Sequence, residues 1–265
     1  MAFFMRLIDS HCHLDLSAFD ADRGEVMSLA SANGVSDIIV PSVQASTWSK
    51  LQSLESQESP LAIHAAYGLH PVFEKHHVEH DLILLERQLE NEECVAVGEC
   101  GLDFFVDEYD RVKQLRLFAG QLDLAKQFSL PVIIHSRKSL DLVLKELRLR
   151  PGLKGVVHSF SGSFQQAKQL IDLGFYLGFG GPITYPRARR LRSLVAELPL
   201  ENLLLESDAP DQPDILHWGE RNEPAWLSEV ALCIAGLRGC SVHEVAEVTT
   251  RNCEKLFQLK HATLC

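Results

Sequence analysis

Eight short apolar runs rich in β-branched residues recur along the chain, separated by segments with helical periodicity. The runs lie near residues 6–10, 36–41, 62–67, 94–98, 131–135, 155–158, 175–179 and 203–207. Between them, apolar residues return at spacings of three and four, as Leu82, Leu85 and Leu89 do. Strands that alternate with helices indicate a parallel sheet, and continuously apolar strands indicate that both sheet faces are covered. The sequence therefore predicts an α/β fold.

Two architectures fit this pattern: a closed eight-stranded (β/α)8 TIM barrel and an open, doubly wound sheet. The count of eight and the length of 265 residues favour the barrel, which usually takes about 250 residues. No repeat of fixed period and no linker rich in Pro, Gly or Ser divides the chain. We expect residues 1–265 to form a single domain, with a last helix around 241–257 that packs on the outside of the barrel.

Candidate metal ligands stand where five of the apolar runs give way to loops. They are His11 and His13 after the first run, Glu99 after the fourth, His135 after the fifth, His158 after the sixth and Asp208 after the eighth. In an open sheet these strand ends would form a line. In a barrel the first and eighth strands are neighbours, so all six side chains meet at one mouth. The sequence therefore predicts one site.

Each candidate also has a simpler interpretation. Side chains two apart on a strand share a face, so His11 and His13 can reach one cation while Cys12 points away. Either histidine alone would be an ordinary core or surface residue. Glu99 could instead form a buried salt bridge with Arg137. The convergence of six positions favours the metal site over these separate readings.

The residue types predict two divalent cations. We assign His11, His13 and Asp208 to one ion, His135 and His158 to the other, and Glu99 to a position between them. Mixed nitrogen and oxygen ligands suit zinc best, with manganese or magnesium as alternatives. Two such cations activate water for hydrolysis, and Asp208 could accept its proton. We therefore expect Asp208 and Glu99 to be catalytic.

Motifs throughout the chain resemble those of the TatD family of metal-dependent deoxyribonucleases, within the amidohydrolase-like superfamily. They include Asp9-Ser10-His11-Cys12-His13-Leu14-Asp15, Gly68-Leu69-His70-Pro71, Gly98-Glu99-Cys100-Gly101-Leu102-Asp103, Pro131-Val132-Ile133-Ile134-His135-Ser136-Arg137, His158-Ser159-Phe160-Ser161-Gly162 and Glu206-Ser207-Asp208-Ala209-Pro210. The resemblance implies an eight-stranded barrel, dependence on divalent metal and hydrolysis of a phosphodiester. It places the metal ligands on the same six residues. Cys100, Ser159 and Ser207 depart from the usual family residues, and none of them removes a ligand.

The expected substrate is DNA, as single strands or ends. His70 is a candidate substrate contact or a buried structural histidine, and Arg137 could bind a phosphate or support Glu99 or Asp103. One alternative function is hydrolysis of an amide or ester in a smaller substrate, as by a deacylase or phosphatase. Many such barrels use a lysine where this chain has Glu99, which favours the nuclease. A noncatalytic metal-binding or partner-binding protein is the third class.

Charge and composition limit the partners. A net charge of −11 disfavours a broad nucleic-acid surface but allows a local one. The densest basic run, Arg187 to Arg192, is either a solvated helix face or a patch that attracts phosphate. Seven cysteines without a Cys-x-x-Cys pair argue against a disulfide framework. No apolar run approaches membrane-spanning length. We expect a cytoplasmic protein with no membrane association and no obligate protein partner.

Overall fold

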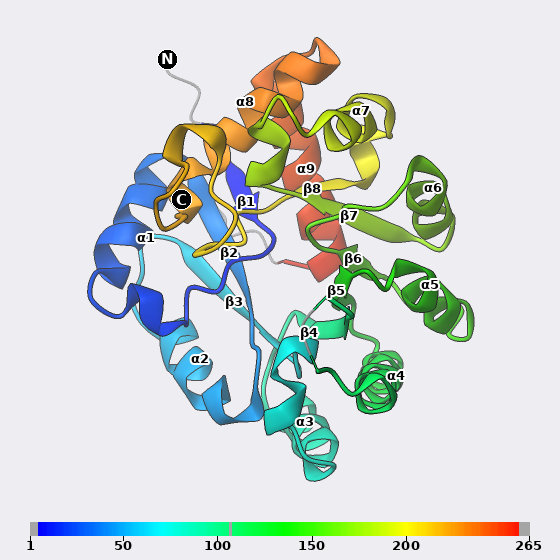
Figure 1. Cartoon of the computed structure of the whole chain (residues 1–265). Coiled ribbons are helices and arrows are strands. Elements are labelled where there is room, and N and C mark those ends of the chain that lie inside the picture. The colour runs from blue at the N-terminus through cyan, green and yellow to red at the C-terminus, as the bar shows by residue number, and fades with distance from the viewer. Residues whose placement is uncertain (1–4, 106–107, 260–265) are drawn as a thin grey trace.

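One parallel eight-stranded sheet runs through the part of the chain that the computed structural model describes, residues 5–105 and 108–259. Its strands are β1 (Leu7–Asp9), β2 (Val35–Pro41), β3 (Ala62–Tyr67), β4 (Ala96–Asp103), β5 (Val132–Arg137), β6 (Gly155–Val157), β7 (Phe175–Phe179) and β8 (Leu203–Leu205). They pair in chain order, and the Ser10 N–H donates to the Leu205 carbonyl at 2.9 Å (Figure 1). This last bond joins β1 to β8 and closes the barrel. The predicted TIM barrel is confirmed, and the open sheet is excluded.

Helices alternate with the strands and surround them. They are α1 (Arg23–Ala32), α2 (Trp48–Glu55), α3 (His80–Asn91), α4 (Arg111–Phe128), α5 (Leu140–Arg148), α6 (Phe164–Asp172), α7 (Arg189–Glu197), α8 (Leu227–Arg238) and α9 (Val242–Phe257). Short 3-10 segments span Ser17–Phe19, Ala45–Thr47, Pro71–His76, Gly181–Thr184, Leu200–Asn202, Ile215–His217 and Pro224–Trp226. The predicted apolar stripe of Leu82, Leu85 and Leu89 lies on α3.

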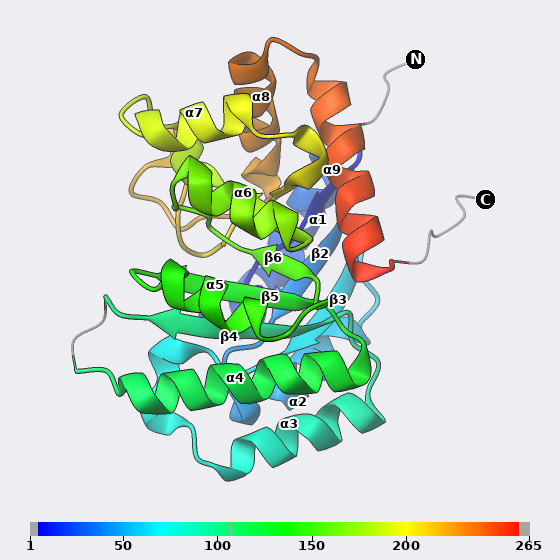
Figure 2. The ribbon, with the colours of Figure 1, turned by 90° about the vertical axis from the view of Figure 1, so that its right-hand side faces the viewer.

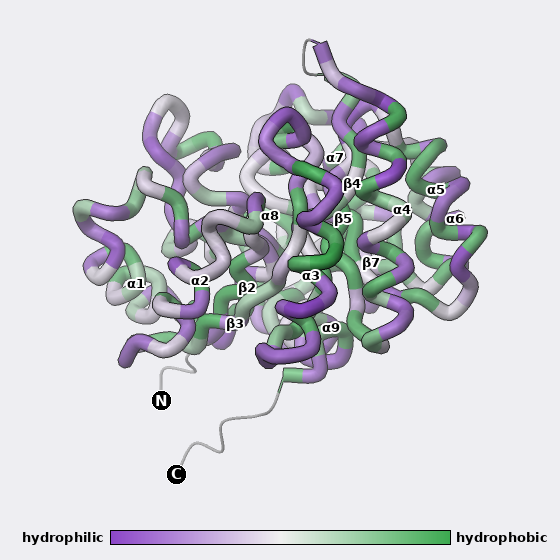
Figure 3. The backbone as a smooth tube through the Cα atoms, turned by 90° about the horizontal axis from the view of Figure 1, so that it is seen from below, coloured by the Kyte–Doolittle hydropathy of each residue, from purple (hydrophilic) through white to green (hydrophobic). Residues whose placement is uncertain are grey.

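Side chains alternate between the barrel interior and the helices that cover it. Ile39 of β2 belongs to the interior cluster, whereas its neighbours Ile38 and Val40 belong to the larger cluster that includes helix residues. This is the period of two that a strand imposes. Figure 3 shows the apolar colour following the strands and the polar colour on turns of the helices.

Helix α9 covers the end of the barrel where the strands begin. Cys253, Leu256 and Phe257 pack in the same cluster as interior residues such as Ile8 and Leu204. Figure 2 shows α9 across this end, opposite the loop that follows β4. The bounds predicted for the last helix are confirmed, but the helix forms the floor of the barrel rather than lying beside its wall. The opposite mouth is left for the site.

Strand β4 extends further than its apolar run predicts. The run ends at Gly98, yet β4 continues to Asp103, so Glu99 lies within a strand and not after it. The flanking glycines allow β4 and β5 to approach closely: a Cβ on Gly101 would lie 2.0 Å from the His135 carbonyl oxygen, and one on Gly98 would lie 2.7 Å from the Ile133 Cβ. The expectation that Glu99 lies where the fourth run gives way to a loop is therefore wrong.

Within residues 5–105 and 108–259, no single helix is both long and apolar enough to cross a bilayer. The segments Pro224–Arg238 and Val242–Phe257 pass this test of length and composition only when joined, across a bend of 113°.

Candidate metal centre

The carboxylate of Glu99 lies at the middle of the barrel mouth, with 1% of its side chain exposed. Its Oε2 is 3.1 Å from His11 Nε2 and 3.2 Å from His13 Nε2. Asp208 Oδ1 approaches the same two nitrogens at 3.6 and 3.8 Å. The loop after β1 carries the two histidines, and the loop after β8 carries Asp208. The Asp208 N–H donates to the His11 carbonyl, which holds the two loops together where the barrel closes. The convergence expected of these four residues is observed.

The other oxygen of Glu99 faces a second set of histidines. Oε1 lies 2.7 Å from His158 Nε2, 3.1 Å from His135 Nδ1 and 3.1 Å from His70 Nε2. His135 lies within β5, and His158 follows β6 directly. Because each oxygen of Glu99 faces a different set of imidazoles, the carboxylate is placed between the two sets.

These contacts fit a metal centre better than a hydrogen-bonded core. Glu99 Oε2 makes no hydrogen bond of acceptable geometry with the described residues, although it is buried and close to two imidazole nitrogens. Ligand atoms that share one ion lie about 2.9–3.4 Å apart, given metal–ligand distances of about 2.0–2.1 Å. The 3.1 and 3.2 Å separations fall in that range. The donor set of imidazole nitrogens and carboxylate oxygens suits a divalent cation.

Hydrogen bonds behind two imidazoles set which nitrogen faces the site. His13 Nδ1 lies 3.1 Å from the Pro41 carbonyl oxygen, which can only accept, so Nδ1 carries a proton and Nε2 faces Glu99, where it can ligate a cation once its own proton is displaced. His135 Nε2 lies 2.9 Å from Asp103 Oδ2, so its Nδ1 faces the site. A partner behind a ligating histidine fixes its tautomer and ring orientation. Asp103 therefore orients His135, as its place in the motif suggested.

Two further buried carboxylates support the site, and the sequence did not single out either role. Asp9 Oδ1 accepts the N–H groups of His11 and Ser207, which ties the ends of β1 and β8 together. Glu206 accepts the Ser159 N–H, and its Oε1 lies 3.9 Å from His158 Nδ1. The sequence feature that could have indicated both roles is an acidic residue at the end of an apolar strand.

The electrostatics favour a cation at Glu99. Burial alone would raise the pKa of Glu99, but the surrounding imidazoles, His70 and His158 foremost, hold it well below its usual range. Burial lowers the pKa of His13 and His158, yet the Glu99 carboxylate outweighs it and raises them to about 9 and about 10. Burial raises the pKa of Glu206 to about 8. Positive charge between these groups is therefore stabilised. To bind there, a metal ion must displace the protons that the histidine nitrogens would otherwise hold.

The grouping of ligands differs in part from the predicted one. Among the residues that the structure describes, three sets of atoms could each hold an ion: His11 with His13 and Glu99, His11 with His158 and Asp208, and His70 with Glu99 and His135. His70, a candidate substrate contact or buried structural histidine, thus joins the ligand cluster. It is the N-cap residue of the 3-10 segment after β3, and its Nδ1 accepts the Val72 N–H. The number of ions bound, and which ion each residue would hold, stay predictions.

Arg137 does not pair with Glu99. Its guanidinium lies 3.6 Å over the Phe105 ring at the exposed end of β5, while histidines contact both oxygens of Glu99. The alternative of a buried salt bridge is therefore wrong. Arg137 lines a cavity of about 670 Å³ that opens above the cluster, together with His13, Asp208 and Gln212. A cavity of this size accommodates a small substrate or part of a larger one.

The basic run after β7 is divided among different environments. Arg192 donates to the Ile183 carbonyl at 2.9 Å and is half-buried, and Arg187 lies 5.1 Å over the Tyr185 ring. Arg190 is exposed and donates to the Gly162 carbonyl at 3.1 Å. The run is therefore neither a uniformly solvated helix face nor one phosphate patch.

Gly178 of β7 has no space for a side chain, and its replacement should disturb the site. A Cβ there would lie 2.0 Å from Glu206 Oε2 and 3.1 Å from His158 Cα. We expect Gly178→Ala to lower the free energy of unfolding by about 1–3 kcal/mol, as overpacking does. It should lower kcat/KM about 100-fold, because His158 moves. Thermal denaturation and steady-state kinetics measure both effects.

Gly236→Ala is the matched control, since a Cβ at this position in α8 meets no atom within 4 Å. It should keep full activity and leave stability unchanged or raised by up to about 1 kcal/mol. Equal stability and activity in Gly178→Ala and Gly236→Ala would contradict the close packing of Gly178 against Glu206.

Comparison with known proteins agrees with this fold and with a metal-dependent hydrolase. A family model described as TatD related DNase matches residues 8–258. The chain is 40% identical over 257 residues to the uncharacterized metal-dependent hydrolase YjjV of Escherichia coli (strain K12), covering 96% of this chain and 98% of YjjV. It is 35% identical over 255 residues to the uncharacterized metal-dependent hydrolase YabD of Bacillus subtilis (strain 168), covering 96% and 99%.

A solved structure extends the likeness to three dimensions. The crystal structure of YjjV, a TatD homolog from Escherichia coli K12, superposes with a TM-score of 0.92 at 39% identity, over 97% of this chain and 100% of that one. The resemblance seen in the motifs is thus confirmed over nearly the whole length. The chain belongs to the TatD-related DNase family and is a TatD-type metal-dependent hydrolase.

Proposed function

We propose that the protein is a phosphodiesterase that cleaves DNA at ends or in single strands with the aid of two divalent cations, zinc being the preferred metal. The observation that carries this proposal is the position of Glu99. Its two oxygens face two sets of imidazole nitrogens at 2.7–3.2 Å, which is the arrangement a carboxylate shared by two cations requires. Manganese and magnesium are the alternative metals.

The chain's own groups divide the work. Glu99, with the histidines around it, would hold the cations. Asp208 is the more exposed carboxylate, with 12% of its side chain accessible against 1% for Glu99, so it faces the cavity where substrate enters. Gln212 donates to Asp208 Oδ2, which leaves Oδ1 directed at the cluster. Arg137 at the rim is available to pair with a phosphate.

The proposed reaction is hydrolysis. Water attacks phosphorus, one P–O ester bond breaks, and the water proton passes to Asp208 Oδ1. When bound, a pair of divalent cations lowers the pKa of water and neutralises charge on the phosphate oxygens. Asp208 then gives its proton to solvent or to the departing oxygen, which restores the starting state.

The experiment is a metal-dependence test on a substrate panel. Protein stripped with chelator should lose activity, and zinc, manganese or magnesium should restore cleavage of an end-labelled single-stranded oligonucleotide and of bis(4-nitrophenyl) phosphate. Double-stranded DNA, a phosphate monoester, an N-acyl amide and a carboxylic ester complete the panel. Turnover of the amide, carboxylic ester or monoester without turnover of either diester would overturn the proposal in favour of a deacylase, esterase or phosphatase.

A further inference from the structure

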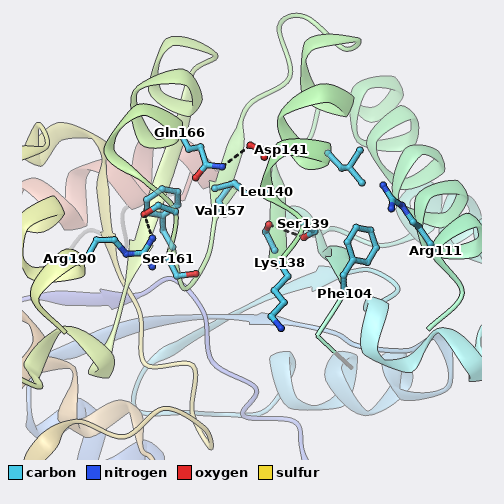
Figure 4. A pocket seen from close by; sticks show the side chains of 14 residues that line it. Phe104, Arg111, Lys138, Ser139, Leu140, Asp141, Val157, Ser161, Gln166 and Arg190 are labelled. Carbon is cyan, nitrogen blue, oxygen red and sulfur yellow. Dashed lines mark hydrogen bonds between the residues drawn. The ribbon is translucent and has the colours of Figure 1, made fainter. Parts of the chain in front are cut away.

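A second cavity opens beside the metal-site cavity, at the mouth of the barrel between β5 and β6. Its volume is about 440 Å³, and it shares Ser136, Phe160 and Ser161 with the first cavity (Figure 4). A substrate held at the metal site can therefore extend into it. Nothing in the reaction itself requires this second space.

The lining of this cavity is basic in an otherwise acidic protein. Among the described residues that line it, three are cations, Arg111, Lys138 and Arg190, and one is a carboxylate, Asp141. Figure 4 shows Arg190 on one side, Arg111 on the other and Lys138 between them. Asp141 accepts a hydrogen bond from Gln166 at 2.7 Å, so its charge is partly compensated. With a net charge of −11 on the whole chain, such a cavity concentrates anions locally.

Helix α5 adds a second attraction for an anion. Its N-cap residue, Ser139, donates its hydroxyl to the Leu102 carbonyl at 2.7 Å and does not cap the helix. At the neighbouring α6, Ser163 and Gln166 form a complete capping box. The N-terminus of α5 thus faces the cavity without a side-chain acceptor, and a phosphate oxygen would supply one.

Aromatic rings stand beside these cations. Phe104 lines the cavity, with the Arg111 guanidinium 5.2 Å from its centroid. Phe105 is 49% exposed and lies 4.5 Å from Lys138 Nζ. Cations with an exposed aromatic side chain beside them are typical of surfaces that bind single-stranded nucleic acid, because the cations contact phosphates and the aromatic side chain can contact a base.

We propose that this cavity is a phosphate subsite for a polynucleotide substrate. It binds a backbone phosphate next to the scissile one, with Lys138 and Arg190 as the main contacts. The proposal rests on the phosphodiesterase function proposed above and deepens it, because it names a polymeric substrate rather than an isolated diester. A diester without a neighbouring phosphate would not use the cavity.

The test compares a double variant on two substrates. In Lys138→Ala/Arg190→Ala, KM for a single-stranded octanucleotide should rise about 10-fold with kcat within about twofold. The slope of log affinity against log salt concentration should flatten by about 0.7, because one backbone phosphate loses its neutralising contacts. For bis(4-nitrophenyl) phosphate, which has one diester only, kcat/KM should not change. An unchanged KM for the octanucleotide, or an equal loss on both substrates, would overturn the subsite.

A matched control and a binding measurement complete the design. Lys126→Ala/Lys154→Ala removes two exposed lysines near the opposite end of the barrel and should behave as wild type. Binding of a fluorescein-labelled octanucleotide is followed by anisotropy in an Asp208→Asn background, where Lys138→Ala/Arg190→Ala should weaken affinity about 10-fold. Equal affinity with and without these two changes refutes the subsite. Absence of wild-type turnover of both diesters refutes the proposed function instead, so the two failures are distinguishable.

Discussion

Replacing Asp208 by Asn should lower kcat on a phosphodiester by about 10²–10⁴-fold, the contribution typical of a group that transfers a proton in the transition state. Asn has the shape of Asp but cannot take up the water proton, and it places no negative charge beside His11 and His13. The fold should persist. Asp208 has φ +56°, a left-handed conformation that Asn also adopts readily, and the Asn oxygen can still accept from Gln212.

Asp211→Asn is the control for that variant. Asp211 lies three residues further along the same loop, is exposed and loses the same charge on substitution. Its turnover should stay within about twofold of wild type, because Asp211 lines the exposed wall of the cavity but belongs to none of the candidate ligand sets found among the described residues. If Asp208→Asn turned over substrate as fast as Asp211→Asn, with both variants folded by circular dichroism, Asp208 would have no catalytic role.

Replacing Glu99 by Gln should have the largest effect on metal binding. Glu99 is the only residue whose two oxygens lie within 3.2 Å of both sets of histidines in the described part of the chain. An amide presents one oxygen, carries no charge and cannot serve both sets. Metal affinity should fall by well over the roughly 10–100-fold that follows loss of an outer partner alone, and turnover should fall with it.

Asp103→Asn provides the graded comparison for Glu99→Gln. It weakens the support behind His135 at Nε2 and leaves Glu99 in place, so its loss of metal affinity should remain within about 10–100-fold. Glu90→Gln, an exposed carboxylate on α3, should bind metal as wild type does. Titration with a competing chelator measures all three variants. A Glu99→Gln protein that binds metal as tightly as Asp103→Asn would contradict the bridging position of Glu99.

The barrel could be predicted because its cause is local and repeated. Every strand is an apolar run, and the intervening stripes mark helices, so the β-type runs match all eight strands. Strand length was harder to predict. The fourth apolar run ends before Glu99, whereas Gly98 and Gly101 permit close contact between β4 and β5, and the strand continues to Asp103. Which atoms a Cβ at these glycines would meet depends on the position of the neighbouring strand. The residues of β4 alone do not reveal that position.

The convergence of the six candidate ligands could be predicted because barrel closure brings strand ends together. The orientation of the His70 side chain could not be predicted. Its place in the ligand cluster depends on the 3-10 segment that begins at Pro71 and on the Val72 N–H that holds its ring. The supporting carboxylates Asp9 and Glu206 were equally hidden, since each acts through a backbone N–H supplied by another strand end or loop.

The most direct test of the central claim is anomalous X-ray scattering from crystals of the zinc-loaded protein. We expect two peaks per chain, about 3.5–4 Å apart, as in two-metal sites. One should lie next to His11, His13 and Glu99 Oε2, and the other next to His135 and Glu99 Oε1. A single peak, or two peaks of which either lacks Glu99 as a ligand, would contradict the account.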